Sequence, residues 1–125
     1  MTASGCLFGL AFGDALGKPT EFMTVAEIRG RYGPGGPRED ACRISGAGWI
    51  AEEALATGLF CAIRHADDPI SGLARAAATS GDSDSIACLT GAFLGAAHGL
   101  SVWPTRWTER IEYKDQLAAM GQCWD

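Results

Sequence analysis

The segment Ser80-Gly-Asp-Ser-Asp-Ser-Ile-Ala-Cys-Leu-Thr-Gly-Ala-Phe-Leu-Gly-Ala-Ala-His-Gly99 places two carboxylates, Asp82 and Asp84, before a long apolar run. Because one residue separates them, an extended loop points both side chains to the same side. Closely spaced carboxylate and hydroxyl oxygens, that of Ser85 included, are ligands that Mg²⁺ and Mn²⁺ prefer. Helix capping is the alternative, since these residue types also accept hydrogen bonds from the free N–H groups of a helix start. The spacing alone favours capping.

The residues after this motif predict the helix that follows it. Apolar side chains recur at helical spacing over 85–98, from Ile86 through Leu94. A second helix is predicted over 3–16, where glycine stands at every fourth position, at 5, 9, 13 and, just beyond, 17. Each glycine inside a helix costs about 1 kcal/mol relative to alanine. Since such a stripe lets another backbone approach closely, we expect tight helix crossings.

Further segments complete a predicted all-α fold, a compact bundle of about six helices. They are residues 24–33, 50–65, 69–78 and a last helix that begins with Thr105 as its cap and carries Trp107, Ile111, Leu117 and Ala118. Thr24 and Glu27 predict a capping box at the first of these, and Asp68 before Pro69 predicts the start of the third. Residues 33–37 predict a turn-rich loop.

Histidine and tryptophan side chains receive structural interpretations. His65 and His98 fall at predicted helix ends, where the dipole favours a cation, so we interpret them as caps rather than catalysts. Trp103, Trp107 and Trp124 are predicted to pack in the core or at its edge, with adenine stacking as the alternative.

Composition limits the class of protein. The chain has 125 residues, which fit a single domain over 1–125 with a modest core. Its net charge of −5 argues against a nucleic-acid surface. No apolar stretch approaches the roughly 20 residues of a membrane span, so no membrane partner is expected. The five cysteines are far apart and lack zinc spacing, so we expect reduced, mostly buried thiols in a cytoplasmic protein.

Three segments, in order, resemble the ADP-ribosylglycohydrolase family. Residues 80–99 are similar to that family's C-terminal metal motif. Gly5-Cys-Leu-Phe-Gly-Leu-Ala-Phe-Gly-Asp-Ala-Leu-Gly-Lys-Pro-Thr-Glu-Phe22 resembles its N-terminal helix and the loop with an acidic residue, and Gly48-Trp-Ile-Ala-Glu-Glu-Ala-Leu55 resembles the opening of its late core helix. Together they cover most of the chain.

The resemblance implies a metal-dependent hydrolase. Family members cleave the N- or O-glycosidic bond between ADP-ribose and a protein side chain, commonly arginine or serine, with two Mg²⁺ or Mn²⁺ ions that orient ribose hydroxyls and activate water. Carried over by motif, Asp82, Asp84 and Ser85 are the metal ligands. The implied partner is ADP-ribose or an ADP-ribosylated protein.

The resemblance also implies substrate contacts outside the metal motif. Glu21 matches an acidic residue that approaches the substrate ribose. There it would act as a general base or bind a ribose hydroxyl, so Glu21, Asp82 and Asp84 are the predicted catalytic residues. Without the family, Glu21 would be interpreted as a surface acid. Gly48 and Trp49 match a segment near the same ribose, so they are predicted to bind substrate.

One part of the family pattern is missing. Full-length members carry a central Thr-Asp-Asp or Asp-Asp-Thr cluster that supplies the other half of the two-metal site, whereas the sole Asp-Asp pair here, Asp67-Asp68, indicates a helix start. We interpret the chain as the two ends of a family member joined across an internal deletion near 38–46. Such a deletion leaves a second metal ion with few ligands and uncovers apolar helix faces that favour self-association as a homo-oligomer.

Three hypotheses stay open. The first is a compact hydrolase, supported by the intact 81–85 motif together with Glu21. The second is a non-catalytic relative that binds metal or ADP-ribose, or that regulates a full-length homologue, and it is supported by the missing cluster. The third is an inactive fragment, which would show no stabilisation by metal ions.

Overall fold

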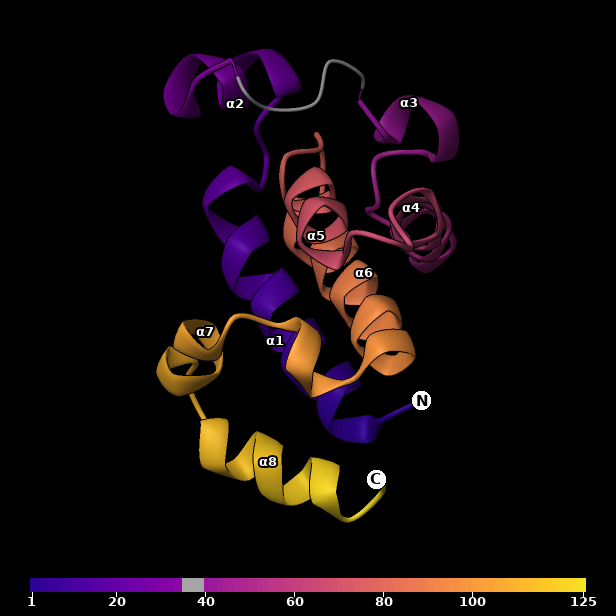
Figure 1. Ribbon diagram of the computed structural model, residues 1–125. Coiled ribbons are helices and arrows are strands. Elements are labelled where there is room, and N and C mark those ends of the chain that lie inside the picture. The colour runs from indigo at the N-terminus through magenta and orange to yellow at the C-terminus, as the bar shows by residue number, and fades with distance from the viewer. Residues whose placement is uncertain (35–39) are drawn as a thin grey trace.

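The computed structural model describes residues 1–34 and 40–125, which form helices and connecting loops (Figure 1). The main elements are α1 (Ala3–Gly17), α2 (Val25–Tyr32), α4 (Ala51–Arg64), α5 (Pro69–Ala77), α6 (Ser83–His98) and α8 (Lys114–Gln122). Shorter elements are η1 (Lys18–Thr20), α3 (Cys42–Ser45), η2 (Leu100–Val102) and α7 (Thr105–Arg110). The predicted all-α fold is confirmed. Part of the loop expected at 33–37, and the start of the region near 38–46, lie outside the described residues.

The central feature is the close packing of α1 along α6. A Cβ atom on Gly5, Gly9 or Gly13 would lie 2.1, 2.0 or 1.9 Å from a backbone oxygen of α6. At Gly17 it would lie 2.5 Å from the Cα atom of Asp84. The crossing that the glycine stripe predicts is confirmed, and it places the end of α1 against the first turn of α6.

The hydrophobic core surrounds this helix pair. Its members are Phe8 and Phe12 of α1, Cys61 and Ala62 of α4, Leu73, Ala76 and Ala77 of α5, Ile86, Ala87 and Leu94 of α6, with Ala41, Cys42 and Trp103 from other segments. The Trp103 ring lies edge-on to Phe12, with centroids 5.8 Å apart, and its Nε1–H donates to the Gly5 carbonyl oxygen at 3.3 Å. Packing is thus confirmed for Trp103, whereas Trp124 is 83% exposed and its predicted packing is wrong.

The C-terminal region departs from the single last helix that was expected. Pro104 precedes α7 as its cap residue, so the prediction that Thr105 caps the helix is wrong. The helix then ends at Arg110, and α8 begins only after Tyr113, whose φ is 58°. A left-handed residue interrupts a right-handed helix, which divides the apolar pattern between two short elements. The carboxylate of Asp125 ties the chain end to α1 by accepting the Ser4 N–H at 2.9 Å.

The other helix predictions largely hold. The capping box of Thr24 and Glu27 is present at α2, and the Asp68 side chain accepts the Ser71 N–H at the start of α5. His65 is the C-cap residue of α4. The short helix α3 was not predicted, because four residues give no periodic signal. No described helix combines the length and apolar character needed to cross a membrane.

The cysteines are less buried than expected. All five are free thiols, but Cys6 and Cys88 are only half-buried and Cys123 is exposed, so the expectation of mostly buried thiols is wrong. Burial raises the pKa of Cys61 to about 11, which keeps this core thiol protonated and agrees with a packing role.

Candidate metal centre

The loop before α6 positions the two motif carboxylates. Gly81 has a φ of 74°, and a Cβ atom there would lie 2.1 Å from the Ala47 carbonyl oxygen, so both the turn and the close approach favour glycine. Asp82 is the N-cap residue of α6, and its side chain accepts the Ser85 N–H at 3.4 Å. Asp84 accepts the same N–H at 2.8 Å. The capping interpretation of the motif is therefore confirmed, and both carboxylates keep further oxygens for another ligand.

Glu21 joins these two carboxylates. One carboxylate oxygen each from Glu21, Asp82 and Asp84 lies within 4.8 Å of the others. Glu21 follows η1, directly after α1, so the contact of α1 with the first turn of α6 brings it to residues far along the chain. Three hard oxygen donors at this separation are the kind of set that holds Mg²⁺ or Mn²⁺.

A lysine that sequence reasoning missed lies against the same cluster. The Nζ atom of Lys18 is 2.5 Å from Oε2 of Glu21 and 3.4 Å from Oδ2 of Asp84. The hydrogen bonds to these carboxylates raise the pKa of Lys18. Its position three residues before Glu21 is a local signal for this ion pair. The cluster thus already holds one positive charge, that of the Lys18 ammonium group.

The two motif carboxylates differ in acidity because they interact. Burial, together with the hydrogen bond between the two side chains, raises the pKa of Asp82. Burial also opposes ionisation of Asp84, but hydrogen bonds with Asp82, Ser85 and Lys18 outweigh it and lower the pKa of Asp84. Two adjacent carboxylates resist double ionisation, and a nearby cation relieves that repulsion.

The remaining predicted residues lie around the cluster. Ser85 reaches both aspartates through its backbone N–H, as given above. Gly48, with a φ of 82°, lies beside the cluster: a Cβ atom there would be 3.4 Å from the Cβ of Asp82. Its N–H donates to Oε2 of Glu53 at 3.1 Å. The structure therefore places the segment at Gly48 next to the motif, while its contact with substrate stays a prediction.

An exposed aromatic pair adjoins the carboxylates. Trp49 stacks on Phe22 with ring centroids 5.2 Å apart and an angle of 21° between the planes. The rings are 51% and 73% exposed. Phe22 directly follows Glu21, has a φ of 67°, and donates its N–H to the Gly81 carbonyl at 3.2 Å. Sequence reasoning missed Phe22, because stacking across loops distant in sequence has no local pattern.

Asp40 holds the loop that leads into the motif. Its carboxylate accepts the Ser80 N–H at 3.1 Å, the Ser80 hydroxyl, the Thr79 hydroxyl at 2.8 Å and the Cys42 N–H at 3.2 Å. Burial opposes ionisation, but these hydrogen bonds lower the pKa of Asp40. This residue therefore anchors the segment just before Gly81, a role for which its sequence position gives no signal.

We expect Asp40→Asn to destabilise the fold by about 1 kcal/mol at neutral pH, since charge-assisted hydrogen bonds are weakened at a partly solvated site. The pKa of Asp40 is lower in the folded protein than in the unfolded chain, where it is about 3.9. The ionised carboxylate therefore stabilises the fold fully at pH values above that unfolded pKa. That contribution is lost as the pH falls through the folded pKa. Urea unfolding over a pH series measures the difference between the two proteins, which should vanish in acid. The exposed Asp67→Asn is the control, and an equal loss there would contradict the assignment.

Comparison with protein-family models identified the family of this chain. The family model described as ADP-ribosylglycohydrolase matches residues 2–41 and 36–124, which together span nearly the whole chain. The two matched segments meet close to the region near 38–46, where the deletion itself stays a prediction. Searches of curated proteins and of solved structures gave no match.

Proposed function

Because the chain belongs to the ADP-ribosylglycohydrolase family, we propose that it is a metal-dependent hydrolase that removes ADP-ribose from modified protein side chains. The observation that supports this most is the convergence of Glu21, Asp82 and Asp84, whose oxygens come from distant segments of the chain to within 4.8 Å of one another. A mere capping motif at α6 gives no reason for Glu21 to lie there.

Asp82, Asp84 and the hydroxyl of Ser85 would hold one Mg²⁺ or Mn²⁺ ion, with Glu21 facing it and water completing the coordination. Such an ion, when bound, supplies Lewis acidity and lowers the pKa of water. The Lys18 side chain, 65% exposed, can swing into solvent as an ion enters. The described residues place three carboxylates in this cluster, which is enough for one ion and few for the two of the family.

The chain's own groups have distinct parts in this proposal. Glu21 accepts a proton from water or binds a ribose hydroxyl, since it is the carboxylate outside the aspartate pair. The exposed Phe22–Trp49 stack forms an apolar wall beside the carboxylates, against which a sugar ring can pack. Gly48 keeps its loop close to Asp82, because a Cβ atom there would lie 2.8 Å from the Ile86 side chain. This loop would contact the substrate.

A second candidate function is binding without turnover. The missing central cluster favours it, because a single ion and a short chain leave ADP-ribose with less to orient it. This protein would then recognise ADP-ribose or regulate a full-length homologue. The free cysteines support the cytoplasmic location that we propose for either function.

The test is release of ADP-ribose from ADP-ribosylated arginine and serine peptides, with Mg²⁺ or Mn²⁺ and with a chelator. We expect metal-dependent release by the native chain and a loss of at least about 100-fold in Asp82→Asn, since even outer-shell changes at metal sites cost 10- to 100-fold. Asp115→Asn on α8 is the matched control. Tight binding of ADP-ribose without release would support the second function, and neither binding nor release by folded protein would contradict both.

A further inference from the structure

Helix α4 carries an apolar ridge on its outer face. Leu55, Leu59 and Ile63 follow one another at intervals of four residues, so they line one stripe of the helix. Their side chains are 50%, 43% and 68% exposed, while the small residues on the other side of α4 are buried. Two exposed acids flank this α4 ridge, Glu52 before it and Asp67 after the helix ends. An exposed apolar stripe of this kind is a candidate interaction surface.

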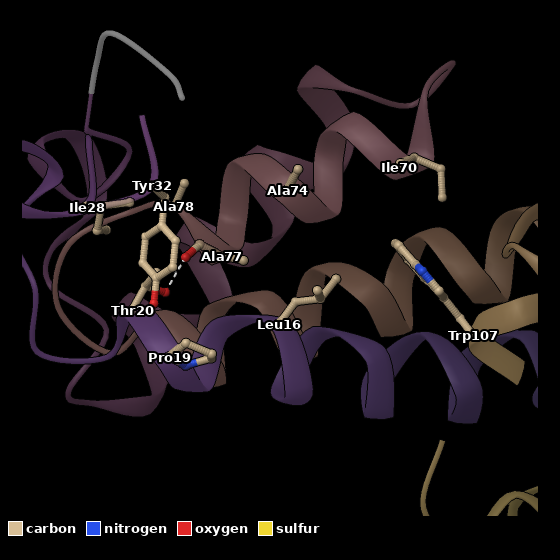
Figure 2. Close-up of a pocket in the computed structure, with 10 residues that line it drawn as sticks. All are labelled: Leu16, Pro19, Thr20, Ile28, Tyr32, Ile70, Ala74, Ala77, Ala78 and Trp107. Carbon is tan, nitrogen blue, oxygen red and sulfur yellow. Dashed lines mark hydrogen bonds between the residues drawn. The ribbon is translucent and has the colours of Figure 1, made fainter. Parts of the chain in front are cut away.

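A complementary hollow lies elsewhere on the molecule. A groove of about 360 Å³, lined almost wholly by apolar atoms, runs between α1, α2, α5 and α7 (Figure 2). Leu16 lies at its floor, Ile70 and Ala74 form the α5 wall, and Tyr32 and Trp107 stand at its two ends. We call this the α1–α5 groove. Its size suits a few apolar side chains.

Cations mark both ends of the α1–α5 groove. The guanidinium of Arg31 lies 5.5 Å from the ring centre of Tyr32, at one end. At the other end, Arg110 lines a neighbouring hollow together with Leu16 and Trp107, which also belong to the groove. Both arginines are exposed. An exposed arginine therefore lies near each end of the groove, and an exposed acid lies near each end of the α4 ridge.

We propose that the α4 ridge of one copy docks into the α1–α5 groove of a second copy. The charged residues at the ends of the two surfaces favour docking of a ridge into a groove over pairing of two ridges or of two grooves. Two ridges packed antiparallel about Leu59 would bring Glu52 of one copy towards Asp67 of the other, and two grooves would bring arginines together. Arg64, the one base in α4, lies five residues from Leu59 and so points away from the ridge at about 3.6 residues per turn.

The proposed contact joins different surfaces, so it is a head-to-tail interface. Each copy in a pair keeps one free ridge or one free groove, and assembly continues unless a ring closes. The mass in solution therefore rises with protein concentration. Added salt weakens the assembly, because the exposed acid–arginine pairs at its ends are screened.

Two substitutions at exposed positions separate the two surfaces. Leu59→Glu disables the ridge, and Ala74→Glu places a charge in the groove. We expect each variant alone to sediment as a monomer of 13.1 kDa. An equimolar mixture contains one intact ridge and one intact groove, so it should form a heterodimer of twice that mass and nothing larger. Ala119→Glu, an exposed alanine on α8, should assemble like the native chain.

Analytical sedimentation over a wide concentration range measures the assembly state of the native chain and of each variant, and circular dichroism checks that each variant is folded. Ile63→Glu replaces Leu59→Glu if the latter does not fold, because Ile63 is 68% exposed. A native chain that stays monomeric at every concentration overturns the proposal. So does full assembly of Ala74→Glu, which would leave the groove without a role. A mixture of two monomeric variants that fails to form the heterodimer also overturns the proposal, because each mixture still contains one intact ridge and one intact groove.

Discussion

Gly9→Ala unfolds most of the protein at room temperature. The new Cβ atom would lie 2.0 Å from the carbonyl oxygen of Gly91 and 2.9 Å from the Trp103 ring. The closest obstacle is backbone, which cannot rotate aside, so α1 must move away from α6. Overpacking costs about 1–3 kcal/mol where side chains adjust, and a displaced helix pair at the centre of a small fold costs more. The gain of about 1 kcal/mol in helix propensity does not offset this loss.

Gly30→Ala is the matched control, since the same substitution in α2 meets no atom within 4 Å. It should stabilise the protein by about 0.5–1 kcal/mol, because alanine is the better helix former. Thermal unfolding followed by circular dichroism compares the two variants with the native chain. If Gly9→Ala melted within a degree of the native protein, the close approach of α1 and α6 would be refuted.

If the proposed metal centre binds Mn²⁺ or Mg²⁺, we expect Asp84→Asn to remove most of the stabilisation that the ion gives to the native chain. An ion at 100 times its dissociation constant stabilises a folded protein by about 2.7 kcal/mol, which is roughly 10 °C in melting temperature for a chain of this size. Asp84 contributes both a ligand oxygen and a negative charge, and its loss leaves Glu21 and Asp82 to balance a divalent ion. Thermal shift measured over a metal titration reports the change directly, without any substrate.

Lys18→Met shifts the same titration in the opposite direction. The ammonium group lies 2.5 Å from Glu21 and 3.4 Å from Asp84, so it competes with an entering cation for these carboxylates. Its removal should lower the metal concentration at half-saturation, whereas Asp84→Asn raises it. Asp115→Asn on α8 should leave it unchanged. Equal metal responses in Asp84→Asn and the native chain would exclude the cluster as the metal site.

Local signals in the sequence predicted the main helices and the metal motif. The capping box at Thr24, the start of α5 at Asp68 and the glycine stripe of α1 each depend on neighbours within a few turns, and each is present. The site prediction beyond the motif came from family resemblance, which paired Glu21 with residues far along the chain. The stack of Phe22 on Trp49 had no comparable signal.

The spacing of apolar residues did not show which face of a helix is buried. The apolar pattern over 50–65 predicted α4 correctly, but it combined a buried side of small residues with an exposed side of large ones. Only the packing against α5 and α6 decides which side faces the core, because small residues allow the closer approach. Likewise, the apolar pattern after Thr105 did not reveal the left-handed backbone at Tyr113.

The sequence by itself determined the all-α fold, the helix ends and the aspartate pair, since these follow from backbone propensity and contacts within one or two turns. The tertiary structure decided that Lys18 shares the carboxylates of Glu21 and Asp84, that Asp40 anchors the loop before the motif, and that the α4 ridge faces outwards. These arrangements join segments distant in the chain. They are fixed only when α1 settles on α6, because that crossing sets which side chains meet.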